Sequence, residues 1–284
     1  MSKRLLIKKH LESLDDIHSV MAAMKNIAVT ETHKLAHMVA YQSRVQASVA
    51  AACNDFLAHF PRFGSSELHS AKRLLVVIGS QRGFCGDFNE ALLAAVRREW
   101  EAQDATATVL IGRRLASKVG SDPRVVATLD GPNVVEEIQT VLLHLMDVLS
   151  GIQTNQKSDE WLDIHLLLNQ EDSHQVVLKS VYPTGSTQVD QAPSGYPPYL
   201  HGSPATFYKD LLHHYLSTQL NDAFYGSLMT ENRRRLQHMD SAMQRIEERR
   251  TELECRFNLL RQEEITEEIE VIMLSSATQI KQRR

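Results

Sequence analysis

The sequence predicts an α/β protein dominated by helix. Long N- and C-terminal helices are expected to pair as an antiparallel coiled coil, with a central α/β domain between them in the chain. Three observations predict this class: apolar heptads near both ends, no glycine or proline in the first 60 residues, and short β-branched runs in the middle. Apolar residues spaced alternately three and four apart form a narrow stripe that supercoils against a partner stripe. The two ends of one chain can therefore fold back and pair.

The N-terminal segment, residues 1–60, is expected to form one helix. Pro61 and the Gly-Ser-Ser cluster at 64–66 end it. At about 1.5 Å of rise per residue, its apolar seam spans on the order of 65 Å, which is too long for one side of a compact domain. The expected contact positions are Leu14, Ile17, Met21, Met24, Ala28, Glu31, Leu35, Met38, Gln42, Val45, Val49, Ala52 and Phe56.

The middle of the chain, residues 72–204, is expected to hold the α/β domain. The predicted strands are 73–79, 107–112, 124–129, 161–168 and 175–182. The predicted helices are 88–101 and a second that Asn133 caps and that runs to Leu149. Strands that alternate with helices imply a parallel, Rossmann-like sheet with crossover helices. The last two strands follow each other too closely for a helix and are expected to form an antiparallel extension.

The C-terminal segment, residues 205–284, is expected to be a second long helix that pairs with residues 1–60. It follows a stretch at 183–204 that contains five of the eight prolines and is predicted to be a loop. The expected seam positions are Met229, Leu236, Met239, Met243, Ile246, Leu253, Phe257 and Leu260.

The apolar pattern of this helix changes phase after Leu260. The apolar positions move to Ile265, Ile269 and Ile272, because strict heptad continuation would place glutamates in the seam. Such a shift marks a change of winding or the point at which a helix leaves its partner. Residues 271–274, Val-Ile-Met-Leu, are apolar all round. Such a helix end is expected to be surrounded by more than the N-terminal helix.

Composition excludes several classes of protein. The 284 residues are 43% apolar and 23% charged, which is ordinary for a folded soluble protein. A net charge of −4 argues against nucleic-acid binding. No apolar run approaches the roughly 18–20 residues that span a bilayer, and the N-terminus lacks the apolar core of a signal peptide. The three scattered cysteines argue against a disulfide framework, so we expect reduced thiols and a cytoplasmic protein.

The loop at residues 79–89, Gly-Ser-Gln-Arg-Gly-Phe-Cys-Gly-Asp-Phe-Asn, follows the first strand, where phosphate-binding loops lie. It lacks the Lys-Ser/Thr of a Walker loop, and Gly83, Gly86 and Asp87 do not fit the dinucleotide fingerprint. A tight strand-to-helix turn that needs glycine for its backbone is therefore favoured over a phosphate site. Cys85 is interpreted as a packed thiol rather than a nucleophile, because no histidine or second cysteine lies near it.

No other constellation indicates chemistry. The pair His33 and His37 has metal-ligand spacing on a helix, yet no third ligand is evident. The acidic run at 263–270 and the basic run at 233–235 are typical of solvated helix faces, and a charge track against a partner is the alternative. We expect no catalytic residue, no cofactor and no metal.

Three separated segments resemble the gamma subunit of the rotary F-type ATP synthases. They are residues 17–28 (Ile-His-Ser-Val-Met-Ala-Ala-Met-Lys-Asn-Ile-Ala), residues 80–89 of the loop, and residues 257–270 (Phe-Asn-Leu-Leu-Arg-Gln-Glu-Glu-Ile-Thr-Glu-Glu-Ile-Glu). Their order and spacing cover the whole chain, and together they are specific.

The resemblance implies a non-catalytic central rotor shaft. In that family the terminal helices turn inside a ring of alternating alpha and beta subunits, and the α/β domain lies near the epsilon subunit and the membrane rotor ring. Rotation couples ion translocation to ATP synthesis or hydrolysis. The protein is then expected to be peripheral on the inner face of the energy-transducing plasma membrane, without direct membrane insertion and without nucleic acid.

The resemblance also assigns residues. Met24 and Lys25 look like the pair that faces the beta-subunit lever. Arg235, Gln262 and Thr266 look like polar positions that contact beta or the opposing helix. The apolar tip formed by Val271, Ile272, Met273 and Leu274 is similar to the family's helix end that turns in an apolar sleeve, and we call it the bearing tip. The residues that build the structural loop are Gly83, Cys85, Gly86 and Asn89.

The chain departs from the family pattern at Gln81, where an acid is usual, at Asp87, where a glycine is usual, and at Glu270, often a small residue. It therefore looks like a divergent member. Two other hypotheses stay open: a non-rotary coiled-coil adaptor, and an α/β enzyme that binds a phosphate ligand through the 79–89 loop. Co-purification with ATPase subunits distinguishes the first, and nucleotide titration the second.

Overall fold

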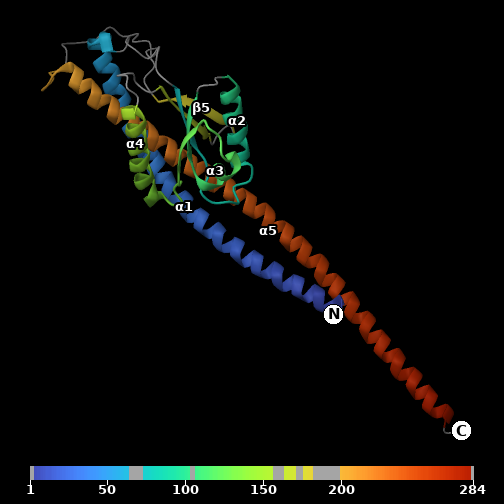
Figure 1. The fold of residues 1–284 in the computed structure, drawn as a ribbon. Coiled ribbons are helices and arrows are strands. Elements are labelled where there is room, and N and C mark those ends of the chain that lie inside the picture. The colour runs from blue at the N-terminus through green and yellow to red at the C-terminus, as the bar shows by residue number, and fades with distance from the viewer. Residues whose placement is uncertain are drawn as a thin grey trace. The chain divides into compact units, whose positions relative to one another are not determined.

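The computed structural model describes residues 3–63, 73–102, 106–155, 163–170, 175–181 and 199–282, with side chains given except at 154–155 and 274–282. Two long helices, α1 (Lys3–His59) and α5 (Pro204–Gln282), begin and end the described chain (Figure 1). The chain divides into two compact units, Met1–Ile27 with Gln237–Arg284, and Ala28–Leu236. We call them the helical unit and the sheet unit, and each is described by itself.

The helical unit is an antiparallel pair formed by the start of α1 and the later part of α5. Arg4 lies 2.6 Å from Glu264, and Lys25 lies 2.5 Å from Asp240. Residue numbers thus rise along one helix as they fall along the other. The predicted antiparallel pairing of the two ends is confirmed.

The seam of this unit is regular along α5. Met239 and Leu253 are buried, and Met243, Ile246, Phe257 and Leu260 are half-buried, as the heptad predicts. Along α1 the buried anchors Ile7 and Met21 also follow the seven-residue repeat.

Within the helical unit, the second α1 heptad position is half-buried at Met24, as predicted, but exposed at Ile17. Ile17 is 47% exposed, whereas His18 is half-buried. The inward stripe joins each anchor to the residue four positions later, because the side chain at i+4 lies almost directly above that at i on a helix. Ile17 faces outward and is a wrong seam assignment.

In the sheet unit the remainder of α1 packs on the first part of α5. The Gln46 amide donates to Gln219 at 3.0 Å, and the rings of Phe56 and Tyr208 stack with centroids 5.6 Å apart. Leu35 is fully buried. Here too the seam shifts by one residue: Met38 and Ala52 are exposed, while Val39 is half-buried and Cys53 is buried.

The sheet unit contains five strands in the order β3-β2-β1-β4-β5. They are β1 (Arg73–Ile78), β2 (Ala107–Ile111), β3 (Val125–Leu129), β4 (Asp163–Asn169) and β5 (Val176–Ser180). β1 pairs in parallel with β2 and β4, β2 pairs in parallel with β3, and β5 pairs antiparallel to β4. The parallel sheet with an antiparallel extension is confirmed.

Each face of the sheet buries its own cluster of side chains. Leu75 and Val77 of β1 pack with Phe88 and Leu92 of α2 (Phe88–Ala102). Helix α3 (Arg113–Val119) lies on the same face through the buried Leu115. The alternate β1 side chains face α4 (Ile138–Asn155) together with α1 and α5. The β-strand period of two therefore separates the two long helices from α2 and α3 (Figure 1).

Some expected elements differ from those observed. Helix α3 was not predicted, because its seven residues are too few to show a helical period. Asn133 does not cap a helix. Its backbone and amide nitrogens donate to the Glu137 carboxylate, and a short 3-10 turn, Val135–Glu137, precedes α4. The proline-rich stretch at 183–198 and Trp161 lie outside the described residues.

Candidate functional site

The 79–89 loop joins the carboxyl end of β1 to the first turn of α2 and is held by its own side chains. The side-chain oxygen of Asn89 accepts a hydrogen bond from the Ser80 backbone N–H at 3.0 Å. The side-chain NH₂ of Asn89 donates to the Ser80 hydroxyl at 2.7 Å. The Ser80 hydroxyl donates to the Arg82 carbonyl at 2.9 Å, and the Cys85 thiol lies 3.4 Å from that hydroxyl. Hydrogen bonds between its own residues therefore connect the start of the loop to its end.

Two residues of this loop, Phe84 and Gly86, have left-handed backbone. Gly86 has φ +61°, a conformation for which glycine is suited. Phe84 has φ +64° although it is not glycine, and its ring is 51% exposed. A bulky residue in this region is strained and persists only where its surroundings fix it.

Gln81 connects three loops at the carboxyl ends of the parallel strands. Its side-chain oxygen accepts the backbone N–H of Arg113, after β2, and of Gly131, after β3, both at 2.9 Å. This oxygen does what either oxygen of a carboxylate could do, so the amide replaces the acid usual in similar sequences without loss of the two acceptor contacts.

These contacts favour a structural role for the loop over phosphate or nucleophilic chemistry. Phosphate loops present free backbone N–H groups, whereas the Ser80 N–H is donated to Asn89. The N–H groups of Arg113 and Gly131 in the neighbouring loops are donated to Gln81. Cys85 is 3% exposed, and burial raises the pKa of its thiol. A thiol in that state is protonated and inert at neutral pH.

Helix α5 contacts this loop through a buried cluster of polar side chains. The Arg235 guanidinium donates to the Gly83 carbonyl at 3.3 Å and to the Asn232 side chain at 2.9 Å, and it forms an ion pair with Glu231. The Arg235 and Glu231 side chains are 8% and 6% exposed. Burial raises the pKa of Glu231, and the positive charge of Arg235 opposes that rise.

Arg234 makes a second link between α5 and the start of α2. It lies 3.1 Å from the Asp87 carboxylate, and its guanidinium lies over the Phe88 ring at 5.7 Å from the centroid. The Asp87 carboxylate accepts the hydrogen bond from this arginine. The Arg234 and Asp87 contact was not anticipated from the sequence.

On the other side of the sheet unit, α1 holds the start of α4. The Glu31 carboxylate accepts the Val135 backbone N–H at 3.1 Å, and Lys34 bridges Glu31 and Glu136 at 3.0 and 2.9 Å. The carboxylate therefore satisfies a donor at the N-terminal end of the 3-10 turn. Glu31 was expected in the seam, and it is 4% exposed.

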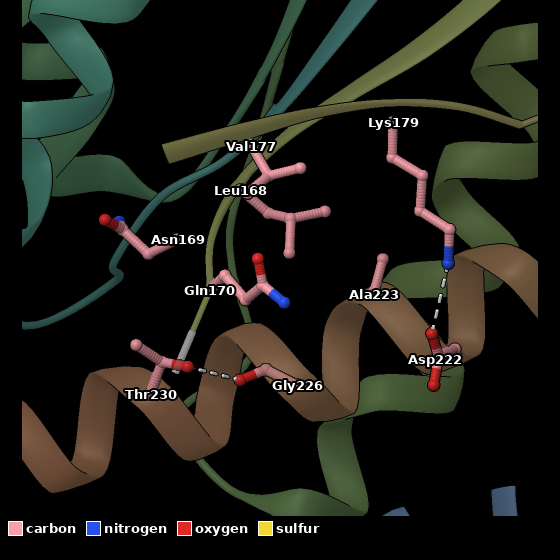
Figure 2. Close-up of a pocket in the computed structure, with 9 residues that line it drawn as sticks. All are labelled: Leu168, Asn169, Gln170, Val177, Lys179, Asp222, Ala223, Gly226 and Thr230. Atoms are coloured by element: carbon pink, nitrogen blue, oxygen red, sulfur yellow. Dashed lines mark hydrogen bonds and ion pairs between the residues drawn. The ribbon is translucent and has the colours of Figure 1, made fainter. Parts of the chain in front are cut away.

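A cavity of about 350 Å³ separates the β4–β5 side of the sheet from α5. Figure 2 shows Leu168 and Val177 of the strands facing Ala223 and Gly226 of the helix. The Lys179 ammonium lies 3.4 Å from the Asp222 carboxylate across one end. A Cβ atom at Gly226 would meet nothing within 4 Å.

The predicted contact residues Met24 and Lys25 lie in the helical unit. Met24 is half-buried, and the Lys25 ammonium forms the ion pair with Asp240 of α5. Asp240 was not identified from the sequence. Its position opposite Lys25 in the antiparallel pairing, with opposite charge, is the signal that could have found it.

The later residues of α5 are exposed. Gln262 and Thr266 are exposed, and the Thr266 hydroxyl donates to the Gln262 carbonyl of the same helix. Val271, Ile272 and Met273 are each about two-thirds exposed. Leu274 belongs to α5, but its side chain lies outside the described part.

The fold defines a class of protein with two long paired helices and a doubly wound sheet between them in the chain. The polar groups of the loop bond to other parts of the same chain. A family model described as ATP synthase matches residues 5–278. The chain therefore belongs to the ATP synthase gamma-chain family, whose members form the non-catalytic central stalk, or rotor, of F-type ATP synthases.

Individual relatives agree over nearly full length. The ATP synthase gamma chain of Geobacter metallireducens is 27% identical over 290 residues, covering 97% of this chain and 98% of the relative. That of Heliobacterium modesticaldum is 25% identical over 289 residues, covering 95% and 97%.

The fold is also similar to chains in solved rotor structures. One is in the Euglena gracilis mitochondrial ATP synthase (OSCP/F1/c-ring, rotational state 3), with TM-score 0.66, 14% identity, and 99% and 96% of the two chains covered. Another is in the Tetrahymena thermophila central stalk and c-ring, with TM-score 0.57, 15% identity, and 78% and 99% covered. Among the described residues, no helix is both long and apolar enough to cross a bilayer.

Proposed function

We propose that this chain is the shaft that couples ion translocation through a membrane rotor ring to ATP synthesis or hydrolysis in a ring of alpha and beta subunits. The observation that supports this most strongly is the exposed apolar end of α5. Ile269, Val271, Ile272 and Met273 are between 52% and 65% exposed, although they continue a well-formed helix. Contiguous exposed apolar surface marks an interaction site.

A shaft can drive catalysis only by differential contact. A partner shifts a conformational equilibrium by no more than its difference in affinity for the two states. The exposed faces of the helical unit carry different chemistry along α5: alternating charge at 245–254 and apolar residues near the end. The unit pairs two helices of different sequence, so its surface also differs around its axis, and each rotor angle presents a different surface to the same partner subunit.

Met24 and Lys25 are proposed to face the lever of the beta subunit. The Lys25 side chain is 37% exposed even though it pairs with Asp240, so a second carboxylate can approach it. An ammonium has three donors and can serve both partners. Met24 supplies an adaptable apolar contact beside it.

Arg235 was assigned by resemblance as a possible contact to beta or to the opposing helix. Its side chain is 8% exposed and is engaged by Glu231, Asn232 and Gly83, so little of it is open to a partner. We propose an internal role for Arg235, and external polar contacts for the exposed Gln262 and Thr266.

The apolar end of α5 is proposed to turn in an apolar sleeve formed by the ring. Apolar surfaces make weak, non-directional contacts, so they let a helix rotate without breaking specific hydrogen bonds. The epsilon subunit and the membrane ring are proposed as partners of the sheet unit. The complex is proposed to lie on the cytoplasmic face of the plasma membrane.

The test is ATP-driven ion uptake into inverted membrane vesicles, measured beside ATP hydrolysis. Ile272→Glu and Met24→Lys are expected to lower ion uptake per ATP hydrolysed, because each places a charge on an apolar contact. Met38→Lys, an exposed methionine of the same helix, is the control for Met24. Unchanged coupling in both test variants, with the chain still assembled, would contradict the proposal.

A further inference from the structure

The buried Glu231–Arg235 pair calls for a reason other than stability. Two charges are buried inside the sheet unit, where apolar side chains of similar volume commonly serve stability equally well. Such a pair fixes geometry, because the planar guanidinium accepts only a few orientations of its partners.

The geometry that this pair fixes is that of the loop. Glu231 and Asn232 orient the Arg235 guanidinium from within α5, and its Nε–H donates to the Gly83 carbonyl of the loop at 3.3 Å. The next residue, Phe84, takes the strained left-handed conformation. A backbone held at the carbonyl just before a strained residue has little freedom to relax.

The loop is continuous with the rigid part of the sheet unit. It begins directly after β1, the central strand, and ends in α2, whose Phe88 is fully buried. The Ser227 hydroxyl of α5 also lies 3.5 Å from the Ile78 carbonyl at the end of β1. A displacement of α5 at Arg235 is therefore passed directly to β1 and α2.

The opposite side of the same interface is loosely packed. The cavity of about 350 Å³ separates β4 and β5 from α5, and its one ion pair, Lys179 with Asp222, is partly exposed (Figure 2). Void-lining groups lack contact atoms on one side and resist displacement weakly. Beside this cavity α5 packs on the sheet through buried apolar side chains such as Leu220, Phe224 and Leu228. The loop side adds directional polar contacts from Arg234 and Arg235.

We propose that Arg235, oriented by Glu231, is a positioning residue that locks the 79–89 loop to α5, so that torque passes between the sheet and the shaft helix. This rests on the proposed rotor function. The apolar packing of α5 on β1 and β4 remains when the lock is lost. The loop then moves more freely against α5, and the part of the torque that passes through the loop is lost as slip.

The test uses the assembled complex with Glu231→Leu and Arg235→Met combined. Replacing both charges leaves no unpaired buried charge, so folding and assembly are expected to persist. Hydrogen exchange at residues 83–87 is expected to accelerate, and ion uptake per ATP hydrolysed to fall several-fold. Arg233→Met, an exposed arginine on the same helix, is the control and is expected to change neither.

The outcomes separate the lock from simple structure. Faster loop exchange with unchanged coupling would overturn the proposal, and so would unchanged exchange. If the double variant fails to assemble, Arg235→Lys decides by the same two readouts, because lysine keeps the charge beside Glu231 but loses the fork. Failure of the lock alone leaves Ile272→Glu uncoupled, whereas failure of the rotor function leaves that variant coupled as well.

Discussion

At the scale of single residues, side-chain oxygens complete the backbone hydrogen bonding of the sheet unit. Gln81 closes the ends of β2 and β3, Asn89 closes the loop after β1, and Glu31 closes the start of the 3-10 turn before α4. Each side-chain oxygen accepts a hydrogen bond from a backbone N–H group that has no acceptor in regular secondary structure.

Replacing Gln81 by Leu is expected to lower the free energy of unfolding by about 1–3 kcal/mol, because it leaves the N–H groups of Arg113 and Gly131 without their acceptor. Chemical denaturation of the isolated chain measures it. Gln244→Leu, which removes an exposed glutamine from α5, serves as the control. Equal stability of the two variants would show that the Gln81 contacts contribute nothing.

Asp122 gives the chain a pH-dependent contribution to stability. Hydrogen bonds from the Arg124 side chain and backbone lower the pKa of Asp122 to about 2, from 3.8. Because the folded-state pKa is the lower one, the stabilisation is present above the unfolded value and is lost as the pH falls toward 2. The stability difference from Asp122→Asn should be constant above pH 4 and shrink below it. A difference that grows on acidification would contradict this assignment.

At the scale of elements, the long helices followed from simple sequence rules. The helix bounds Lys3–His59 and the α5 start at Pro204 lie within a residue or two of expectation, because the absence of glycine and proline and the proline-rich stretch are strong local signals. The second α1 seam position was wrong at Ile17, Met38 and Ala52 and correct at Met24, Glu31 and Val45. Positions i+3 and i+4 are both close to the anchor, and only the partner's side chains decide between them.

Alanine substitutions at Gly226 and Gly120 are expected to change stability in opposite directions. A Cβ at Gly226 or at Gly120 meets nothing within 4 Å, yet Gly120 has φ +73° whereas Gly226 lies inside α5. Gly226→Ala should stabilise the chain by about 1 kcal/mol through helix propensity. Gly120→Ala should destabilise it by about 1 kcal/mol through left-handed strain. Thermal unfolding reads both, and a shift of the same sign in the two variants would be inconsistent with this account.

The candidate site was only partly predictable for a physical reason. The resemblance singled out Arg235, but as a contact to beta or to the opposing helix, whereas its side chain is buried against the loop. The missing Walker and dinucleotide patterns favoured a structural loop. Tertiary packing between distant segments brings Asp87 to Arg234 and Asp240 to Lys25. Glu231 lies one helical turn before Arg235, and many such i,i+4 pairs occur on α5, so its sequence position alone does not distinguish it. The exposed left-handed Phe84 carries no sequence signal, because propensity would place glycine there.

At the scale of the whole molecule, one chain supplies both a paired helical unit and a sheet unit, and α1 and α5 run through both. The gamma-chain relatives match over almost their full length, so both units are part of the same conserved arrangement of elements. A shaft of this kind needs stiff helices and a firm attachment to the sheet. We propose that the buried polar cluster at Arg235 contributes to that attachment, beside the apolar packing of α5 on β1 and β4.

The central claim is tested most directly by watching the chain turn. Cys53 and Cys85 are buried, and burial raises the pKa of Cys53 to about 11, so a thiol probe should leave both unmodified. With Cys255→Ser and Val126→Cys, a bead can be attached to the exposed edge strand β3 of the immobilised complex. The account predicts stepwise rotation in one direction when ATP is added. A bead that stays fixed while the complex hydrolyses ATP would contradict it.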